Sequence, residues 1–166
     1  MLLLVSLFWN ICLMREGPER VPTQPLLPGL LVIGKIVLVM LISEPLGREP
    51  TLLGVTTNIA LWTATLACCV GYALFLAAKT HRFAPTFGAI LGVDLLLSAI
   101  LGIVLVPLHL SNMEISLPIS ITYQLWHMAI IGFIMHRALD TTLGIGIGVG
   151  LVISIFCVTI TEVVTQ

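Results

Sequence analysis

Five long apolar runs, separated by short polar links, dominate the hydrophobic pattern of this chain. The runs cover residues 26–43, 57–78, 87–108, 119–139 and 143–163. About 20 mostly apolar residues suffice for a helix to cross the hydrocarbon core of a bilayer. The links hold the Pro, Gly, Asn and charged residues that helix interiors avoid. Because the links are short, consecutive helices should be antiparallel neighbours. The pattern predicts an all-α integral membrane protein with a five-helix transmembrane bundle over residues 26–166.

The first residues form a shorter apolar run that ends at Arg15-Glu16-Gly17-Pro18. No positive charge precedes the run and no small-residue cleavage site follows it, so it does not fit a signal peptide. Residues 1–14 are also too few to cross a bilayer comfortably. We expect a short amphipathic helix in the membrane interface, with Trp9 near the headgroups, and a link up to residue 25. If Met1–Met14 spanned instead, it would add a helix and place the N-terminus outside.

Composition excludes a water-soluble globule. Hydrophobic residues make up 58% of the chain and charged residues only 9%, and the mean hydropathy is +1.15. Typical soluble domains carry about 25% charged residues. The net charge of −1 provides no basic field for nucleic acid. The four cysteines, Cys12, Cys68, Cys69 and Cys157, all lie in apolar runs and are expected to be inert buried thiols.

Basic residues are distributed unevenly between the two sides of the predicted bundle. One side receives five of the seven, and the other receives one together with four glutamates. The first set is Arg15, Arg20, Lys79, Arg82 and Arg137, and the second is Arg48 with Glu44, Glu49, Glu114 and Glu162. Since Lys and Arg concentrate in cytoplasmic loops, we expect a cytoplasmic N-terminus and a C-terminus on the opposite side.

Three residues are the main ionisable groups away from the ends of the predicted spans. Lys35 lies about 13 Å from the start of its helix and Asp94 about 10 Å from the start of a parallel one, at 1.5 Å per residue. An ion pair between them would offset much of the cost of burying either charge. Two alternatives stay open: Lys35 can snorkel to the interface, and a protonated Asp94 can bond a carbonyl or a hydroxyl such as that of Ser98.

The third ionisable residue is His127, near the middle of the fourth span and three residues from Gln124. It is expected to be a hydrogen-bonded interior histidine rather than a metal or haem ligand. As intramembrane polar residues, Lys35, Asp94, His127 and Gln124 are nevertheless candidates for a transport or proton-relay path.

Glycines at four-residue spacing indicate close helix approach. The third span contains Gly88-x-x-x-Gly92. The fifth begins with two interleaved pairs, Gly144/Gly148 and Gly146/Gly150, which face different sides of a helix. Packing within the bundle explains them, and self-association or association with another membrane protein through this helix is the alternative.

No catalytic chemistry is apparent in the sequence. It contains no nucleophile elbow, no HExxH and no Asp-rich metal motif. We therefore expect no enzyme, no catalytic residues, no metal and no cofactor. The expected partners are the lipid bilayer and a membrane protein or a second copy of the chain.

The predicted topology, together with local features, resembles the membrane portion of the Yip1 family and the short bacterial proteins grouped with it. Those features are Trp9 before Arg15-Glu16-Gly17-Pro18, and Trp126-His127 followed by His136-Arg137-Ala138-Leu139. The Asp-Leu-Tyr-Gly-Pro segment of eukaryotic members is missing, and only Gly71-Tyr72 echoes it. The resemblance implies five helices with a cytoplasmic N-terminus, in a bacterial inner membrane here, and transfers no binding residues.

Two functions follow from these observations. The first is a non-enzymatic inner-membrane protein that acts by association, as a Yip1-like scaffold or an accessory subunit of a membrane assembly. The second is a small transporter or ion-conducting protein that uses Lys35, Asp94 and His127 as an internal polar path.

Overall fold

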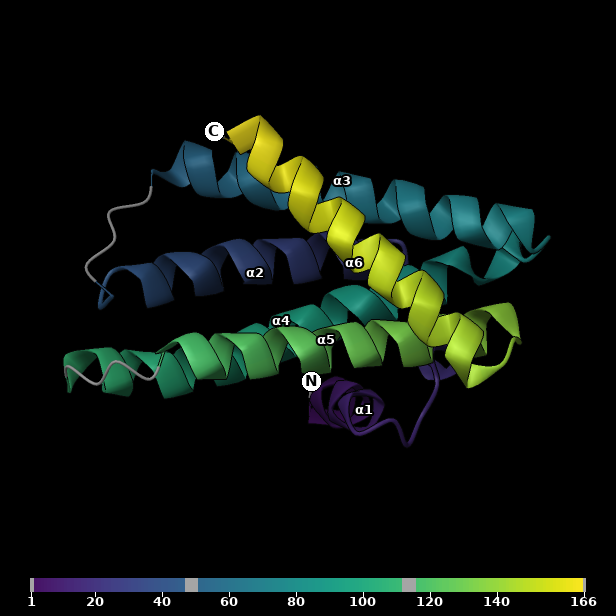
Figure 1. The fold of residues 1–166 in the computed structure, drawn as a ribbon, viewed down its shortest axis with the longest axis horizontal. Coiled ribbons are helices and arrows are strands. Elements are labelled where there is room, and N and C mark those ends of the chain that lie inside the picture. The colour runs from purple at the N-terminus through teal and green to yellow at the C-terminus, as the bar shows by residue number, and fades with distance from the viewer. Residues whose placement is uncertain (1, 47–50, 112–115, 166) are drawn as a thin grey trace.

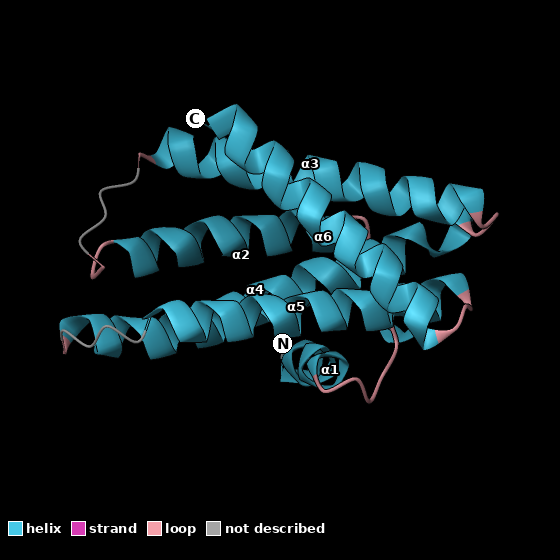
Figure 2. Ribbon diagram, viewed as in Figure 1, coloured by secondary structure: helices cyan, strands magenta, loops and turns pink. Residues whose placement is uncertain are grey.

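The computed structural model describes residues 2–46, 51–111 and 116–165, and the regular elements in these ranges are helices (Figures 1 and 2). In chain order they are α1 (Leu2–Cys12), η1 (Pro18–Arg20), α2 (Leu26–Ser43), α3 (Leu52–Leu76), η2 (Thr80–Arg82), α4 (Phe83–Leu110), α5 (Ser116–Leu139) and α6 (Leu143–Thr165). Within the described ranges, five helices are long and apolar enough to cross a membrane. The predicted all-helical fold with five potential membrane-spanning helices is confirmed. Some of the charged residues on which the predicted orientation depends lie outside the described part of the structure. They are Arg48, Glu49, Glu114 and the side chain of Glu162.

Three helices begin earlier than the sequence pattern predicts, and one of them, α5, starts at Ser116 rather than residue 119. α3 starts at Leu52 rather than residue 57, because the Thr51 hydroxyl accepts a hydrogen bond from the Gly54 amide at 3.1 Å and caps the helix. α4 starts at Phe83 rather than residue 87 and includes Pro85 in its first turn. A proline is tolerated there because first-turn amides have no partner within the helix. α2 has the predicted bounds.

The long helices alternate in direction along the bundle, as the short links predict. α2, α4 and α6 run one way, α3 and α5 run the other, and α6 crosses obliquely over α3 and α5 (Figure 1). The links after α3 and α5 therefore meet at one end of the bundle. This end carries Lys79, Arg82 and Arg137, and we call it the basic end.

The same local geometry terminates three helices. Met14, Ala78 and Asp140 follow α1, α3 and α5 and adopt positive φ angles of 57°, 56° and 48°. After each of them, the next backbone amide bonds a carbonyl five residues back, as Lys79 N does to Leu74 O at 2.8 Å. This is the left-handed helix stop that glycine usually provides.

α1 lies across the bundle rather than along it. In Figure 1 α1 is seen end-on, while the long helices run across the page. Phe8, Ile11 and Cys12 are buried, and the Phe8 ring lies over Gly92 of α4, where a Cβ atom would collide with it. Gly92 is nine residues past the start of α4, about 13 Å along its axis. α1 therefore contacts α4 well beyond the basic end.

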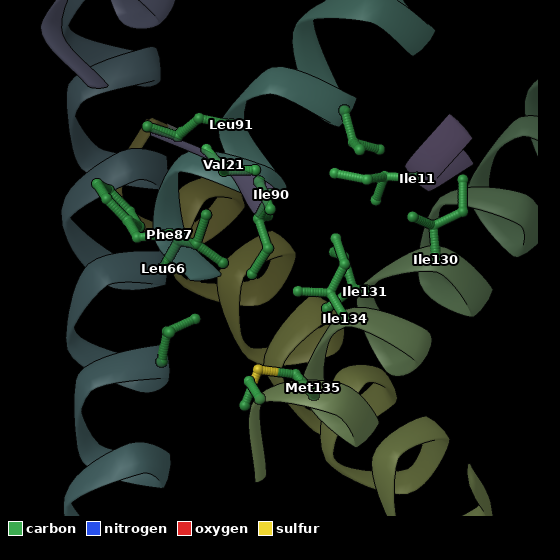
Figure 3. Packing of buried hydrophobic residues seen from close by; sticks show 14 of the residues in the cluster. Ile11, Val21, Leu66, Phe87, Ile90, Leu91, Ile130, Ile131, Ile134 and Met135 are labelled. Carbon is green, nitrogen blue, oxygen red and sulfur yellow. The ribbon is translucent and has the colours of Figure 1, made fainter. Parts of the chain in front are cut away.

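Branched aliphatic side chains fill the space between the helices. Leu66 of α3, Ile90 of α4, and Ile130 and Ile134 of α5 are fully buried together (Figure 3). Ile11 of α1 joins the same cluster. The apolar core extends from α1 through α4 and α5 to α3. A group of polar residues around Asp94 of α4 interrupts it.

Candidate functional site

The predicted ion pair between Lys35 and Asp94 forms in the structure. Lys35 of α2 donates from Nζ to Asp94 Oδ2 of α4 at 2.9 Å, and the two side chains are 19% and 9% exposed. Lys35 also donates to the Ser98 hydroxyl, one turn further along α4. Ser98 thus bonds Lys35 rather than Asp94. Both alternatives, a snorkelling lysine and an aspartic acid bonded to Ser98, are replaced by a paired, hydrogen-bonded cation.

His127 of α5 approaches the other oxygen of the same carboxylate. Its Nε2 lies 3.6 Å from Asp94 Oδ1, beyond hydrogen-bond range but within that of an ion pair. The residue is 5% exposed, and its Nε2 has no hydrogen-bond partner among the described residues. The expectation of a buried histidine is correct, but Nε2 is not hydrogen-bonded as predicted. Its ring stacks on Tyr123, with centroids 5.9 Å apart.

These residues border a cavity of about 210 Å³ to which all five long helices contribute. Its polar lining consists of Lys35 from α2, Asn58 and Thr63 from α3, Asp94 from α4, Tyr123, Gln124 and His127 from α5, and Ser154 from α6. The four polar residues singled out from the sequence are therefore brought to one place. Because every long helix forms part of the wall, tilting of any one of them changes the cavity.

Two polar atoms on this wall have no protein partner among the described residues. They are Nε2 of His127 and the hydroxyl oxygen of Thr63. Leaving a buried donor or acceptor unpaired costs about 1–3 kcal/mol. Such atoms usually face an ordered water, an ion or a ligand, and the cavity is large enough for several water molecules. The arrangement can receive a small hydrogen-bonding group inside the bundle.

Several residues of this site were not identified from the sequence. Asn58, Thr63, Tyr123 and Ser154 contribute polar atoms or walls to it. Asn58 is the one with a detectable signal, as an amide within a predicted span. Hydroxyl residues are common in transmembrane helices, so Thr63 and Ser154 carry no signal of their own.

The glycines of α6 divide between two faces, as their spacing predicts. Gly146 and Gly150 face Gly132 of α5, where an added Cβ would lie 2.6 Å from Gly132 O and 2.5 Å from Gly132 N. For Gly144 and Gly148, no heavy atom of the described chain lies within 4 Å of such a Cβ. One pair therefore packs inside the bundle, and the other lies on its outer surface.

The glycines of α4 serve a different contact. Gly88 lies against Val21, with 3.3 Å between an added Cβ and the valine methyl, and Gly92 lies under Phe8. This GxxxG pair therefore receives mainly the N-terminal segment, and Leu27 of α2 also lies 3.9 Å from a Cβ added at Gly88.

A second cluster of charges lies at the basic end. Lys79 Nζ and Arg82 Nη1 approach Asp140 Oδ2 at 2.7 and 2.9 Å. Lys79 also donates to the Leu139 carbonyl at 2.8 Å, at the end of α5. Hydrogen bonds from Arg82 and Lys79 lower the pKa of Asp140 to about 2. This cluster joins the link before α4 to the end of α5 and has a structural role.

Among the described residues, no group of three or more His, Cys, Asp or Glu side chains lies close enough to hold a metal ion. Comparison with protein-family models, curated proteins and solved structures finds no match to this chain.

Proposed function

We propose that this chain is a small, non-enzymatic membrane transporter that admits a polar group into its bundle and passes it across the membrane. Lys35, Asp94 and His127 receive that group, and Gln124 lines the same cavity. The observation that carries the proposal is the pair of unpartnered buried atoms, His127 Nε2 and the Thr63 hydroxyl, on the wall of a cavity that also holds an ion pair.

Charge and hydrogen-bonding capacity support this use of the cavity. The Lys35–Asp94 pair is formally neutral, and His127 adds a nitrogen that can accept or release a proton. Keeping such groups in a bilayer is costly, so intramembrane ionisable residues generally serve a pathway or a ligand. A purely structural pair needs neither His127 beside it nor a cavity next to it.

Accessibility of the cavity from water tests the proposal. In a background with all four native cysteines replaced by serine, Ser154→Cys places a thiol on the cavity wall. The matched control restores only Cys68, which, contrary to the expectation of a buried thiol, is exposed on the outer surface of α3 within a predicted span. A charged, membrane-impermeant thiol reagent is added to either side of reconstituted vesicles.

We expect the thiol at position 154 to react from both sides and Cys68 to react from neither. Reaction from both sides is required of a cavity that passes a polar group across the membrane. Reaction of the thiol at position 154 from one side only, or from neither, would contradict the proposal.

A second candidate function is association, as a Yip1-like scaffold or an accessory subunit of a membrane assembly. It is favoured by the outward-facing pair Gly144/Gly148, which leaves a shallow strip on α6 between exposed Ile145 and Leu151. Small residues let helix backbones approach closely in a membrane. Gentle detergent extraction followed by size analysis and mass spectrometry tests it, because association predicts a stoichiometric partner or a homo-oligomer that Gly148→Leu dissociates.

We also propose the placement of the chain in an inner membrane, with the basic end in the cytoplasm. The support is the gathering of Lys79, Arg82 and Arg137 at one end of the bundle. The N-terminus would then be cytoplasmic and the C-terminus on the opposite side. Reporter fusions that are active on only one side of the membrane, placed at each terminus, test this orientation.

A further inference from the structure

A second hollow lies next to the polar cavity. It is an apolar groove of about 500 Å³ between α1, α4 and α5. Its walls include Trp9 and Leu13 of α1, Ile100 and Val104 of α4, and Ile119 and Trp126 of α5. The groove depends on α1, because Phe8 and Ile11 anchor this helix and thereby hold Trp9 and Leu13 beside α4 and α5.

Tyr123 lines both the apolar groove and the polar cavity. On the cavity side its ring stacks on His127, and its hydroxyl lies 3.3 Å from the Ser98 hydroxyl that binds Lys35. On the groove side it continues the apolar wall of α5. A tyrosine has an apolar body and a polar tip, so it is stable at such a boundary. Among the described residues, Tyr123 is the one that the two linings share.

We infer that the pair of hollows binds a single-chain amphiphile, with its polar head in the cavity at Lys35, Asp94 and His127 and its hydrocarbon chain in the groove. This inference rests on the proposed function and names its substrate class. Tyr123 stands between α4 and α5 as the side entrance from the groove to the cavity. An adjoining polar and apolar site is what such a molecule requires, whereas a fully water-soluble solute has no use for the groove.

The charges of the cavity define the head. Lys35 and Asp94 already neutralise one another, so a head with net charge would add an uncompensated charge to a low-dielectric site. A zwitterionic head instead presents an anion to Lys35 and a cation to Asp94. The unpaired His127 Nε2 and Thr63 hydroxyl provide the remaining hydrogen bonds. The ligand is therefore a zwitterionic single-chain amphiphile.

The three tryptophans provide the test, because Trp9 and Trp126 line the groove and Trp62 lines the cavity. In a Trp9→Phe/Trp62→Phe variant, Trp126 is the remaining tryptophan and can be excited selectively. The probe is lysophosphatidylethanolamine with a spin label near the end of its chain, added to the protein in vesicles. We expect quenching of Trp126 that saturates and is reversed by unlabelled lysophosphatidylethanolamine.

Matched substitutions on α4 separate the groove from ordinary lipid contact. Val104→Phe narrows the groove, whereas Ile103→Phe adds the same ring to the neighbouring, 73% exposed position that faces away from it. We expect Val104→Phe to raise the Kd of the probe at least tenfold and Ile103→Phe to leave it unchanged. A spin-labelled fatty acid, with its single negative charge, should bind at least tenfold more weakly than the zwitterionic probe.

Quenching that does not saturate, or that is equal in the two α4 variants, overturns the inference. Equal affinity for the fatty acid overturns the assignment of a zwitterionic head. Either result is distinguishable from failure of the proposed function, because the accessibility of the thiol at position 154 is measured separately. If that thiol reacts from both sides while the probe does not bind saturably, the transporter proposal stands and the amphiphile is the wrong substrate.

Discussion

Lys35 and Asp94 are 59 positions apart in the sequence and meet at 2.9 Å between two helices that run in the same direction. His127 Nε2 lies 3.6 Å from the other oxygen of Asp94, so this carboxylate lies between the ammonium group of Lys35 and the imidazole ring of His127. The ion pair offsets much of the free-energy cost of burying both charges. His127 and the adjoining cavity distinguish this site from a purely structural salt bridge.

The first prediction concerns the ion pair. Asp94→Asn should destabilise the folded protein by about 3 kcal/mol, because it leaves Lys35 charged and largely buried without its counter-ion. The double variant Lys35→Met/Asp94→Asn should recover most of that loss, since both charges are gone. The measurement is equilibrium unfolding in mixed micelles. A double variant as unstable as Asp94→Asn alone would show that Asp94 is needed for something other than pairing with Lys35.

The second prediction concerns pH dependence at the basic end. Hydrogen bonds from Arg82 and Lys79 lower the Asp140 pKa from 3.8 to about 2. A depressed carboxylate pKa stabilises the folded state above the unfolded pKa, and that contribution is lost as pH falls from about 4 toward 2. Asp140 is more than half exposed, so the effect is small and salt-sensitive. We expect the thermal midpoint to fall across this window in the parent protein.

Asp140→Asn is the control for this pH effect. Asparagine tolerates the positive φ of 48° at this position, so the helix stop is preserved while the charge is lost. The variant should have a lower midpoint than the parent at pH 6 and in low salt, and most of the difference should be lost as the pH falls to about 2. A difference that persists unchanged at pH 2 would mean that the carboxylate charge is not its cause.

The third prediction separates the two glycine faces of α6. Gly150→Ala should destabilise the protein by about 2 kcal/mol, because its Cβ would lie 2.5 Å from the backbone nitrogen of Gly132. Gly148→Ala meets no described atom within 4 Å and should leave the stability unchanged or slightly raised. Unfolding of the two variants under the same conditions provides the comparison, and equal effects would contradict the packing of α6 on α5.

The sequence predicted the number of long helices and the meeting of Lys35 with Asp94, because both depend on distance along a helix. It did not predict which side of each helix faces inward. The long helices are apolar on all sides, so no polar face indicates their rotation about the helix axis. The orientation of α3 and α5 about their axes determines that Asn58, Thr63 and Tyr123 face the cavity. For the same reason Gly132, which has no glycine four residues away, was not recognised as the partner of Gly146 and Gly150.

The position of α1 was the least accessible to sequence reasoning. A short apolar helix before Arg15-Glu16-Gly17-Pro18 indicates an attachment to the membrane, but its depth depends on a contact with a distant glycine. The Phe8 ring occupies the space that Gly92 leaves free on α4. Phe8 and Gly92 are 84 positions apart in the sequence (92 − 8), so the local hydrophobic pattern does not predict their contact.

The last prediction tests that contact. Phe8→Ala removes the ring that packs on Gly92, and truncation of a buried aromatic side chain costs about 3–5 kcal/mol. Ile11 and Cys12 of α1 stay buried in this variant, so we expect α1 to be loosened rather than released, while the long helices remain folded. Backbone amides of α1 should then exchange hydrogen at least tenfold faster, with little change in α4 and α5. Val5→Ala, on the exposed side of α1, is the matched control and should exchange like the parent protein. Gly92→Leu should reproduce the Phe8→Ala result from the other side of the contact, and unchanged exchange in both variants would show that α1 is held by other contacts.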